Sequence, residues 1–163
     1  MSLLRSIHTI WKNSASLCDA TTGVPHERVF TGRIPQTKQY AFPYVSILVV
    51  GGGQTGRTDK TRYSRALMSF HIWVDDDDLE FAHELATVIS DEYADNCWQI
   101  DSTSKVLDIT DEGEPNAHQT TLPTTKAWEV VKLFTVFIER QRADQDNQCC
   151  VDAFDTSLGS TSL

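Results

Sequence analysis

The 163-residue sequence predicts an α+β domain in which one amphipathic helix packs on an antiparallel or mixed sheet of about four to five strands, with a second helix at the N-terminus. Three stretches lead to this fold class. Residues 65–74 alternate as a strand, residues 79–93 carry apolar side chains at helical spacing, and residues 126–140 form a second long strand pattern. A helix lying across a sheet buries the apolar face of both elements.

The strand at residues 65–74 has two different faces. One face carries Ala66, Met68, Phe70, Ile72 and Val74, and the other carries Leu67, Ser69, His71 and Trp73. We expect the helix at residues 79–93 to cover the first face. The predicted core includes Met68, Phe70, Ile72, Leu85, Ile89, Phe134 and Val136.

The remaining elements follow from local patterns. Apolar residues three and four apart predict an amphipathic helix at residues 3–18, and β-branched residues predict a strand at 44–50 that is buried on both faces. Residues 28–31 are typical of a short edge strand, and residues 98–110 of one or two short strands. Residues 111–115 are typical of a turn. The strand at 126–140 is apolar on both sides, which predicts a central position or burial by a partner chain.

Length and composition limit the classes of protein. Residues 1–142 are expected to form a single domain, and the polar residues 143–163 a flexible or partner-ordered tail. No apolar run approaches the ~20 residues that span a bilayer, so we expect no membrane association, and the N-terminus lacks the pattern of an export signal. The four cysteines, including Cys149 and Cys150, lack metal-ligand spacing, and we expect reduced thiols.

The net charge of −9 argues against a domain that reads DNA sequence, because such domains present a basic face. It is compatible with DNA that passes nearby without being held. No spacing typical of a hydrolase, a zinc site or a nucleophile elbow occurs. We therefore predict no catalytic, cofactor-binding or metal-binding residues, and no enzymatic activity.

The glycine-rich segment at residues 51–62 nearly matches two nucleotide-binding motifs. Both motifs need the loop to open a helix, whereas this segment leads into another strand, and Arg57 stands where a phosphate loop has lysine. We expect an extended, mobile hairpin tip that contacts a partner. Its candidate contact residues are Gly51, Gly53, Gly56, Arg57 and Arg62. A nucleotide-binding enzyme that uses this segment is the alternative.

Four consecutive aspartates, Asp75, Asp76, Asp77 and Asp78, precede the helix at residues 79–93. We interpret them as a helix start, with Asp77 as N-cap and Glu80 completing a capping box. A calcium or magnesium site is an alternative, although the spaced ligand pattern of such loops is missing. A third interpretation is an acidic surface that lines a channel or meets a partner.

Several of these stretches together resemble the tail-terminator, or tail-completion, proteins of long-tailed bacteriophages. The resemblance rests on Phe-Pro-Tyr-Val-Ser-Ile at residues 42–47, the strand and aspartate at 65–75, Ala82 and Ala86 in the helix, and the closing strand at 131–139. It covers residues 3–140. The long connection at residues 19–43 and the tail after Arg140 depart from the family's compact pattern.

The resemblance implies a structural virion protein without catalysis or cofactor. Members of this family form a hexameric ring that caps the tail tube protein and joins the tail to a head-side connector or stopper protein. The ring implies a location in the neck of the virion tail, assembly in the host cytoplasm, and DNA passage without sequence-specific binding. We expect an acidic channel, with the candidate lining residues Asp75, Asp76, Asp77, Asp78, Asp111, Glu112 and Glu114. A monomeric adaptor or binding module is a further alternative.

Overall fold

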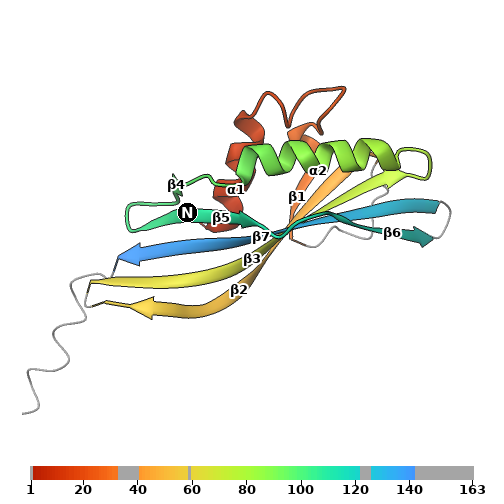
Figure 1. The fold of residues 1–163 in the computed structure, drawn as a ribbon. Helices are drawn as coiled ribbons and strands as arrows, with labels where there is room; N and C mark the ends of the chain where they lie inside the picture. Colours follow the sequence, from red (N-terminus) through yellow and green to blue (C-terminus); the bar gives the residue numbers. More distant parts are fainter. Residues whose placement is uncertain (1, 33–40, 59, 122–125, 142–163) are drawn as a thin grey trace, which may run out of the picture.

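The computed structural model describes residues 2–32, 41–58, 60–121 and 126–141. Two helices lie on one face of a seven-stranded sheet (Figure 1). The elements in chain order are α1 (Leu3–Asn13), the 3₁₀ turn η1 (His26–Arg28), β1 (Val29–Thr31), β2 (Tyr44–Arg57), β3 (Thr61–Asp75), α2 (Leu79–Tyr93), β4 (Trp98–Gln99), β5 (Ser104–Asp111), β6 (Asn116–Thr121) and β7 (Lys126–Gln141). The α+β class is as predicted. The sheet has more strands than the expected four to five.

The sheet is mixed, in the order β1-β2-β3-β7-β5-β4, with β6 also paired to β7. Among the described strands, β1 and β2 run parallel and every other pair is antiparallel. The strand β7 is central, as predicted, because β3 pairs along one side of it while β5 and β6 share the other side. Residues 112–115, between β5 and β6, interrupt what is otherwise one long edge along β7.

The core lies between the sheet and the two helices. All seven predicted core residues are fully buried, which confirms that part of the prediction. Phe70 is central to it, with ring centroids 6.0 Å from Trp11, 5.1 Å from Tyr93 and 5.7 Å from Phe134. Aromatic pairs at such separations stabilise a core beyond their buried area. Tyr93 also donates a hydrogen bond to the carbonyl oxygen of Ile7 at 2.9 Å, which ties α2 to α1.

The predicted end of the first helix and the predicted N-cap of the second are wrong, whereas the second helix spans residues 79–93 as predicted. The first helix ends at Asn13, because Ser14 adopts an extended conformation, although Leu17 beyond it is still fully buried. The N-cap of α2 is Asp78, not Asp77, and its side chain makes no capping hydrogen bond. The predicted capping box between Asp77 and Glu80 is therefore absent. No helix among the described residues has the length and apolarity needed to cross a membrane.

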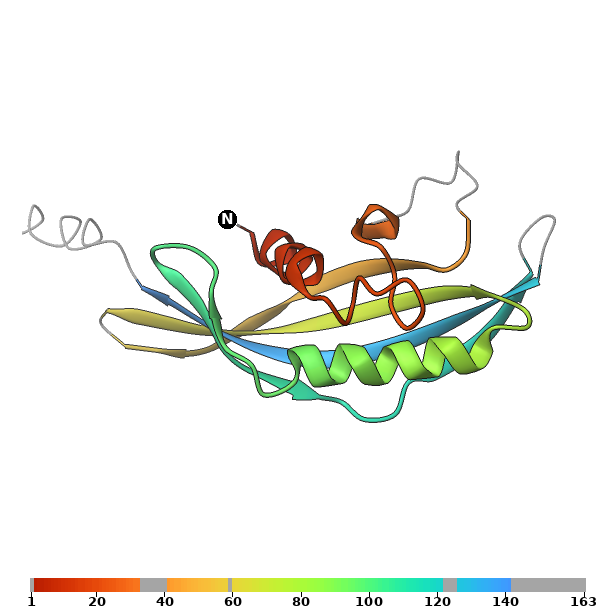
Figure 2. The same cartoon turned by 90° about the horizontal axis from the view of Figure 1, so that it is seen from above.

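The second face of the sheet has no helical layer among the described elements (Figure 1). Val50 is 63% exposed and Leu67, its paired residue on β3, is 42% exposed. The prediction that residues 44–50 are buried on both faces is therefore wrong at the Val50 end. The β2–β3 hairpin and the end of β7 also extend past both helices (Figure 2).

Candidate assembly surfaces

The glycine-rich segment is a bulged strand and not a loop. Gly51, Gly53, Gly56 and Arg57 all belong to β2, and the chain turns between Arg57 and Thr61 before β3 begins. The register slips twice within this segment, between Gly51 and Gln54 and between Gln54 and Gly56. Each slip adds an unpaired residue to β2, which defines a β-bulge. The hairpin is as predicted, but its tip is much shorter than the expected loop.

The glycine that the structure requires differs from those predicted. A Cβ atom on Gly52 would lie 1.5 Å from the carbonyl oxygen of Arg65, whereas one on Gly51 or Gly53 would meet nothing within 4 Å. On Gly56 it would only touch the Tyr63 side chain, at 3.5 Å. Glycine is thus needed at the first bulge, where two backbones approach closely.

The hairpin lacks the structural context of a phosphate loop. A phosphate cradle needs backbone N–H groups at the start of a helix, and here β2 turns directly into β3. Most of the N–H groups of residues 61–75 face paired strands on both sides of β3. The geometry therefore gives no support to nucleotide binding by residues 51–58.

Three arginines form a row across the projecting end of the sheet. Arg57 on β2 is paired with Arg62 on β3, and Arg62 is paired with Arg140 on β7. Directly paired residues project from the same face, and all three side chains are exposed. We call Arg57, Arg62 and Arg140 the arginine row. Lys60, also exposed, lies in the adjacent turn.

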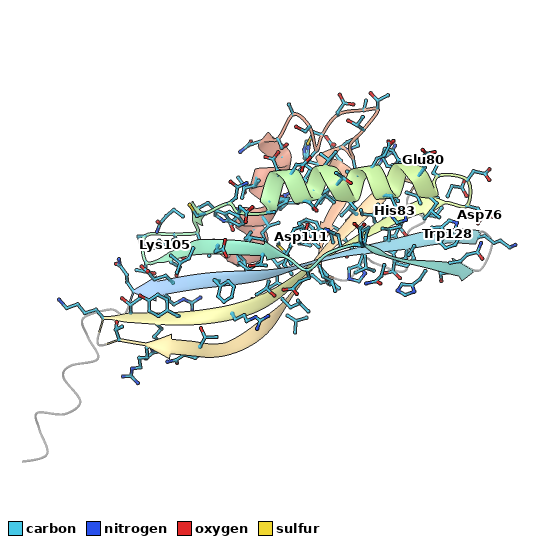
Figure 3. The ribbon with its side chains drawn as sticks, viewed as in Figure 1. Asp76, Glu80, His83, Lys105, Asp111 and Trp128 are labelled. Carbon is cyan, nitrogen blue, oxygen red and sulfur yellow. The ribbon has the colours of Figure 1, made fainter. Side chains whose placement is uncertain are left out.

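The four aspartates occupy the opposite end of β3, and we call Asp75–Asp78 the aspartate turn. Figure 3 shows Asp76 with Glu80 and Trp128 at one end of the molecule, far from Lys105 on β5. All four side chains are exposed. Gln119 donates to the Asp76 carboxylate at 2.8 Å, and the Trp128 indole donates to the Asp76 carbonyl at 3.2 Å, so the turn is held against β6 and β7.

A metal ion at the aspartate turn gains no support from this geometry. Across the described ranges, no group of three or more His, Cys, Asp or Glu side chains is arranged to hold one. A hard cation needs several convergent oxygens. The Asp75 carboxylate instead accepts the N–H of Asp76 at 2.8 Å.

The second acidic segment, residues 111–114, is divided between buried and exposed roles. Asp111 forms an ion pair with the buried Lys132, with 2.7 Å between Oδ1 and Nζ. Partial burial raises the pKa of the Asp111 carboxyl, but hydrogen bonds from Lys132 and from the Gly113 N–H outweigh this and leave it below 3.8. Glu112 is exposed but accepts a hydrogen bond from Thr135. Glu114, the third acidic candidate in this segment, is exposed.

The uncovered sheet face carries a Ser–His–Glu network that the sequence did not reveal. His71 Nδ1 lies 2.6 Å from Glu129 Oε1 on β7, and its Nε2 lies 3.1 Å from Ser69 Oγ. His71 and Glu129 are 58 residues apart, and only the pairing of β3 with β7 brings them together. The arrangement resembles that of a hydrolytic triad.

Two features argue against catalysis by this network. Ser69 is only 9% exposed, so a substrate has little access to its hydroxyl oxygen. A hydrolase also needs N–H donors for an oxyanion, and β3 is paired at Ser69 with Leu48 on one side and Leu133 on the other. We interpret the network as structural. Its hydrogen bonds satisfy the polar groups of Ser69, His71 and Glu129, which lie among apolar side chains such as Leu48 and Leu133 on this face.

No protein-family model matches the sequence, and no curated protein matches it. The fold is similar to that of a solved chain from the virion of a native gene transfer agent particle, with a TM-score of 0.65 and 13% sequence identity. This match covers 85% of the present chain and 95% of that one. A second solved chain is less similar, with a TM-score of 0.46 and 13% identity over 82% of this chain and 93% of that one. The first likeness shows a shared fold.

Proposed function

We propose that this chain is a structural virion protein that forms a ring on the tail tube and joins the tail to the head. The observation that carries the proposal is the fold shared, over 85% of this chain and 95% of the other, with a protein from a gene transfer agent virion. The resemblance of residues 3–140 to tail-terminator proteins supports the same role. By that resemblance the ring is a hexamer in the neck of the virion, assembled in the host cytoplasm.

The surfaces described above are suited to assembly. The uncovered sheet face exposes apolar side chains, including Val50 and Leu67, that a neighbouring chain can bury. The β2–β3 hairpin projects past the helices and offers a contact site for a ring neighbour, the tail tube protein or a head-side connector. Both features support a protein that acts through contacts.

The acidic composition supports DNA passage through the ring. Each phosphate that a protein neutralises adds salt-dependent affinity, so a channel that DNA must slide through is better lined by carboxylates than by lysines. Glu112 and Glu114 are exposed and stay candidates for such a lining. Asp111 is a poorer candidate because Lys132 already pairs with it.

The mass of the assembled protein tests the proposal. Native mass spectrometry should find six times the 18.3 kDa subunit mass, and negative-stain images should show closed rings. Adding purified tail tubes should place the rings at one tube end. A monomer both alone and with tail tubes would instead support the adaptor alternative. A rise in melting temperature with ATP and magnesium would support the nucleotide-binding alternative.

A further inference from the structure

Positive and negative side chains gather at opposite ends of the same strand. The arginine row crosses β3 at its second residue, Arg62, and the aspartate turn begins at the last residue of β3, Asp75. From Arg62 to Asp75 the strand runs about 43 Å at a rise of ~3.3 Å per residue. The Debye length at physiological salt is about 8 Å. Within one molecule, the two clusters therefore cannot neutralise each other.

The arginine row places like charges at directly paired positions. Like charges at directly paired positions destabilise a sheet. Arg57 and Arg140 make no ion pair within the described ranges. The aspartate turn differs, because the N-terminus of α2 already favours negative charge there. The exposed guanidinium groups of Arg57 and Arg140 are therefore the members of the row that we consider for an anionic partner.

Phosphates of DNA and carboxylates of protein both fit the arginine guanidinium. The net charge of −9 disfavours DNA, because an assembly of several copies multiplies that charge and repels the nucleic acid. The aspartate turn offers four exposed carboxylates on every copy. The side chains of Asp77 and Asp78 make no hydrogen bond or ion pair to any described residue. Charge complementarity therefore favours a second copy of this chain.

We infer that the arginine row of one subunit, together with Lys60, binds the aspartate turn of the next. The inference rests on the proposed ring and names the contact that closes it. Because the two surfaces differ and lie at opposite ends of the molecule, the contact is head-to-tail, which forms a ring when the rotation between subunits closes. The inferred contact assigns Asp75–Asp78 to the interface between subunits and not to the channel lining that we expected from the sequence.

Two charge-reversed variants test the contact. One carries Arg57→Glu and Arg140→Glu, and the other carries Asp77→Lys and Asp78→Lys. Each alone brings like charges together, so assembly by native mass spectrometry should need roughly 100-fold more protein than the wild type. Mixed in equal amounts, the two variants should assemble at wild-type concentration, because alternating subunits restore opposite charges at every contact.

Controls separate folding and general charge effects from the contact. An Arg5→Glu, Lys12→Glu variant changes the charge by the same amount on α1 and should assemble normally. Each variant should keep the melting temperature of the wild type, since exposed substitutions usually change stability by no more than about 0.5 kcal/mol. If Asp78→Lys weakens α2, Asp77→Lys alone gives the same test.

The outcomes distinguish the contact from the proposed ring. Wild-type rings that persist in both variants would overturn the contact and leave the proposed function standing. Rings that persist while Arg57→Glu, Arg140→Glu removes salt-dependent binding of duplex DNA would assign the row to nucleic acid. If the wild type forms open chains or rings of another size, and the two variants assemble only when mixed, the contact would be supported and the hexamer excluded. A wild-type monomer at every concentration would overturn both.

Discussion

Lys132 shows how a single residue depends on the fold around it. It lies on the helix-covered side of β7, opposite the interruption between β5 and β6, and it is only 6% exposed. Its ammonium group donates to the Gly113 carbonyl oxygen, pairs with Asp111, and lies 5.8 Å from the centre of the Phe134 ring. The Lys132 ammonium thus holds the segment between β5 and β6 against β7, where the strand pairing is interrupted.

Asp111→Asn should destabilise the fold, because it leaves the Lys132 ammonium buried without a counter-charge. We expect a loss of about 1 to 3 kcal/mol in the free energy of unfolding, measured by urea denaturation at pH 7. A fully buried pair would cost more, but the Asp111 side chain is 26% exposed. Glu114→Gln, in the same turn but exposed, is the matched control and should change little.

The same variant should alter the acid sensitivity of the fold. The pKa of Asp111 is lowered in the folded state, so its stabilising contribution is complete above the unfolded value of 3.8 and is lost as the pH falls towards the folded pKa. Asp19 and Asp101 also have pKa values lowered to about 2, by hydrogen bonds from Thr21 and Thr103. The difference between wild type and Asp111→Asn below pH 4 therefore isolates Asp111. Parallel acid denaturation curves would contradict this assignment.

Gly52 is the residue on which the hairpin geometry depends. Gly52→Ala would place a methyl group against the Arg65 carbonyl oxygen, and we expect it to cost about 1 to 3 kcal/mol, as overpacking does. Gly53→Ala meets nothing within 4 Å and should leave the urea midpoint nearly unchanged. Equal midpoints for the two variants would show that the first bulge is absent in solution.

At the scale of elements, periodicity located those strands and helices whose two faces differ in burial. This covers β3, α2 and most of β7. It failed for β6, whose sequence Asn-Ala-His-Gln-Thr-Thr has no apolar alternation, because pairing with β7 defines that strand and burial does not. It also failed for residues 51–57, since the glycines that suggest a loop here accommodate bulges.

The packing of α2 on β3 and β7 depends on Phe70 and Phe134, which contact each other edge to face. Phe70→Ala or Phe134→Ala should lower the free energy of unfolding by about 3 to 5 kcal/mol, since each side chain is fully buried. Leu67→Ala, on the uncovered face of β3, is the control and should cost far less in the isolated subunit. Thermal or urea unfolding of the three variants measures the difference.

At the scale of the whole molecule, the acidic end of the sheet was visible in the sequence, whereas the basic end was visible only in part, through Arg57 and Arg62 among the predicted contact residues. Asp75–Asp78 are consecutive, so composition alone reveals the cluster. Arg140 follows Arg62 by 78 positions, and only the register of β7 against β3 places the two side by side. A functional surface built across strands therefore needs the pairing of the sheet before it can be recognised.

Truncation after Gln141 tests whether residues 1–141 fold as one domain, which the sequence predicted for residues 1–142. The buried cluster of the described residues runs from Ile7 to Val136, and β7 is paired on both sides. We therefore expect the truncated protein to melt within about 2 °C of the full chain, which corresponds to less than about 1 kcal/mol. Truncation after Trp128 removes most of β7 and should abolish cooperative melting. If the chain truncated after Gln141 keeps its melting temperature but no longer assembles, residues 142–163 would be assigned to contacts between subunits. A large fall in its melting temperature would instead show that the folding unit extends past Gln141.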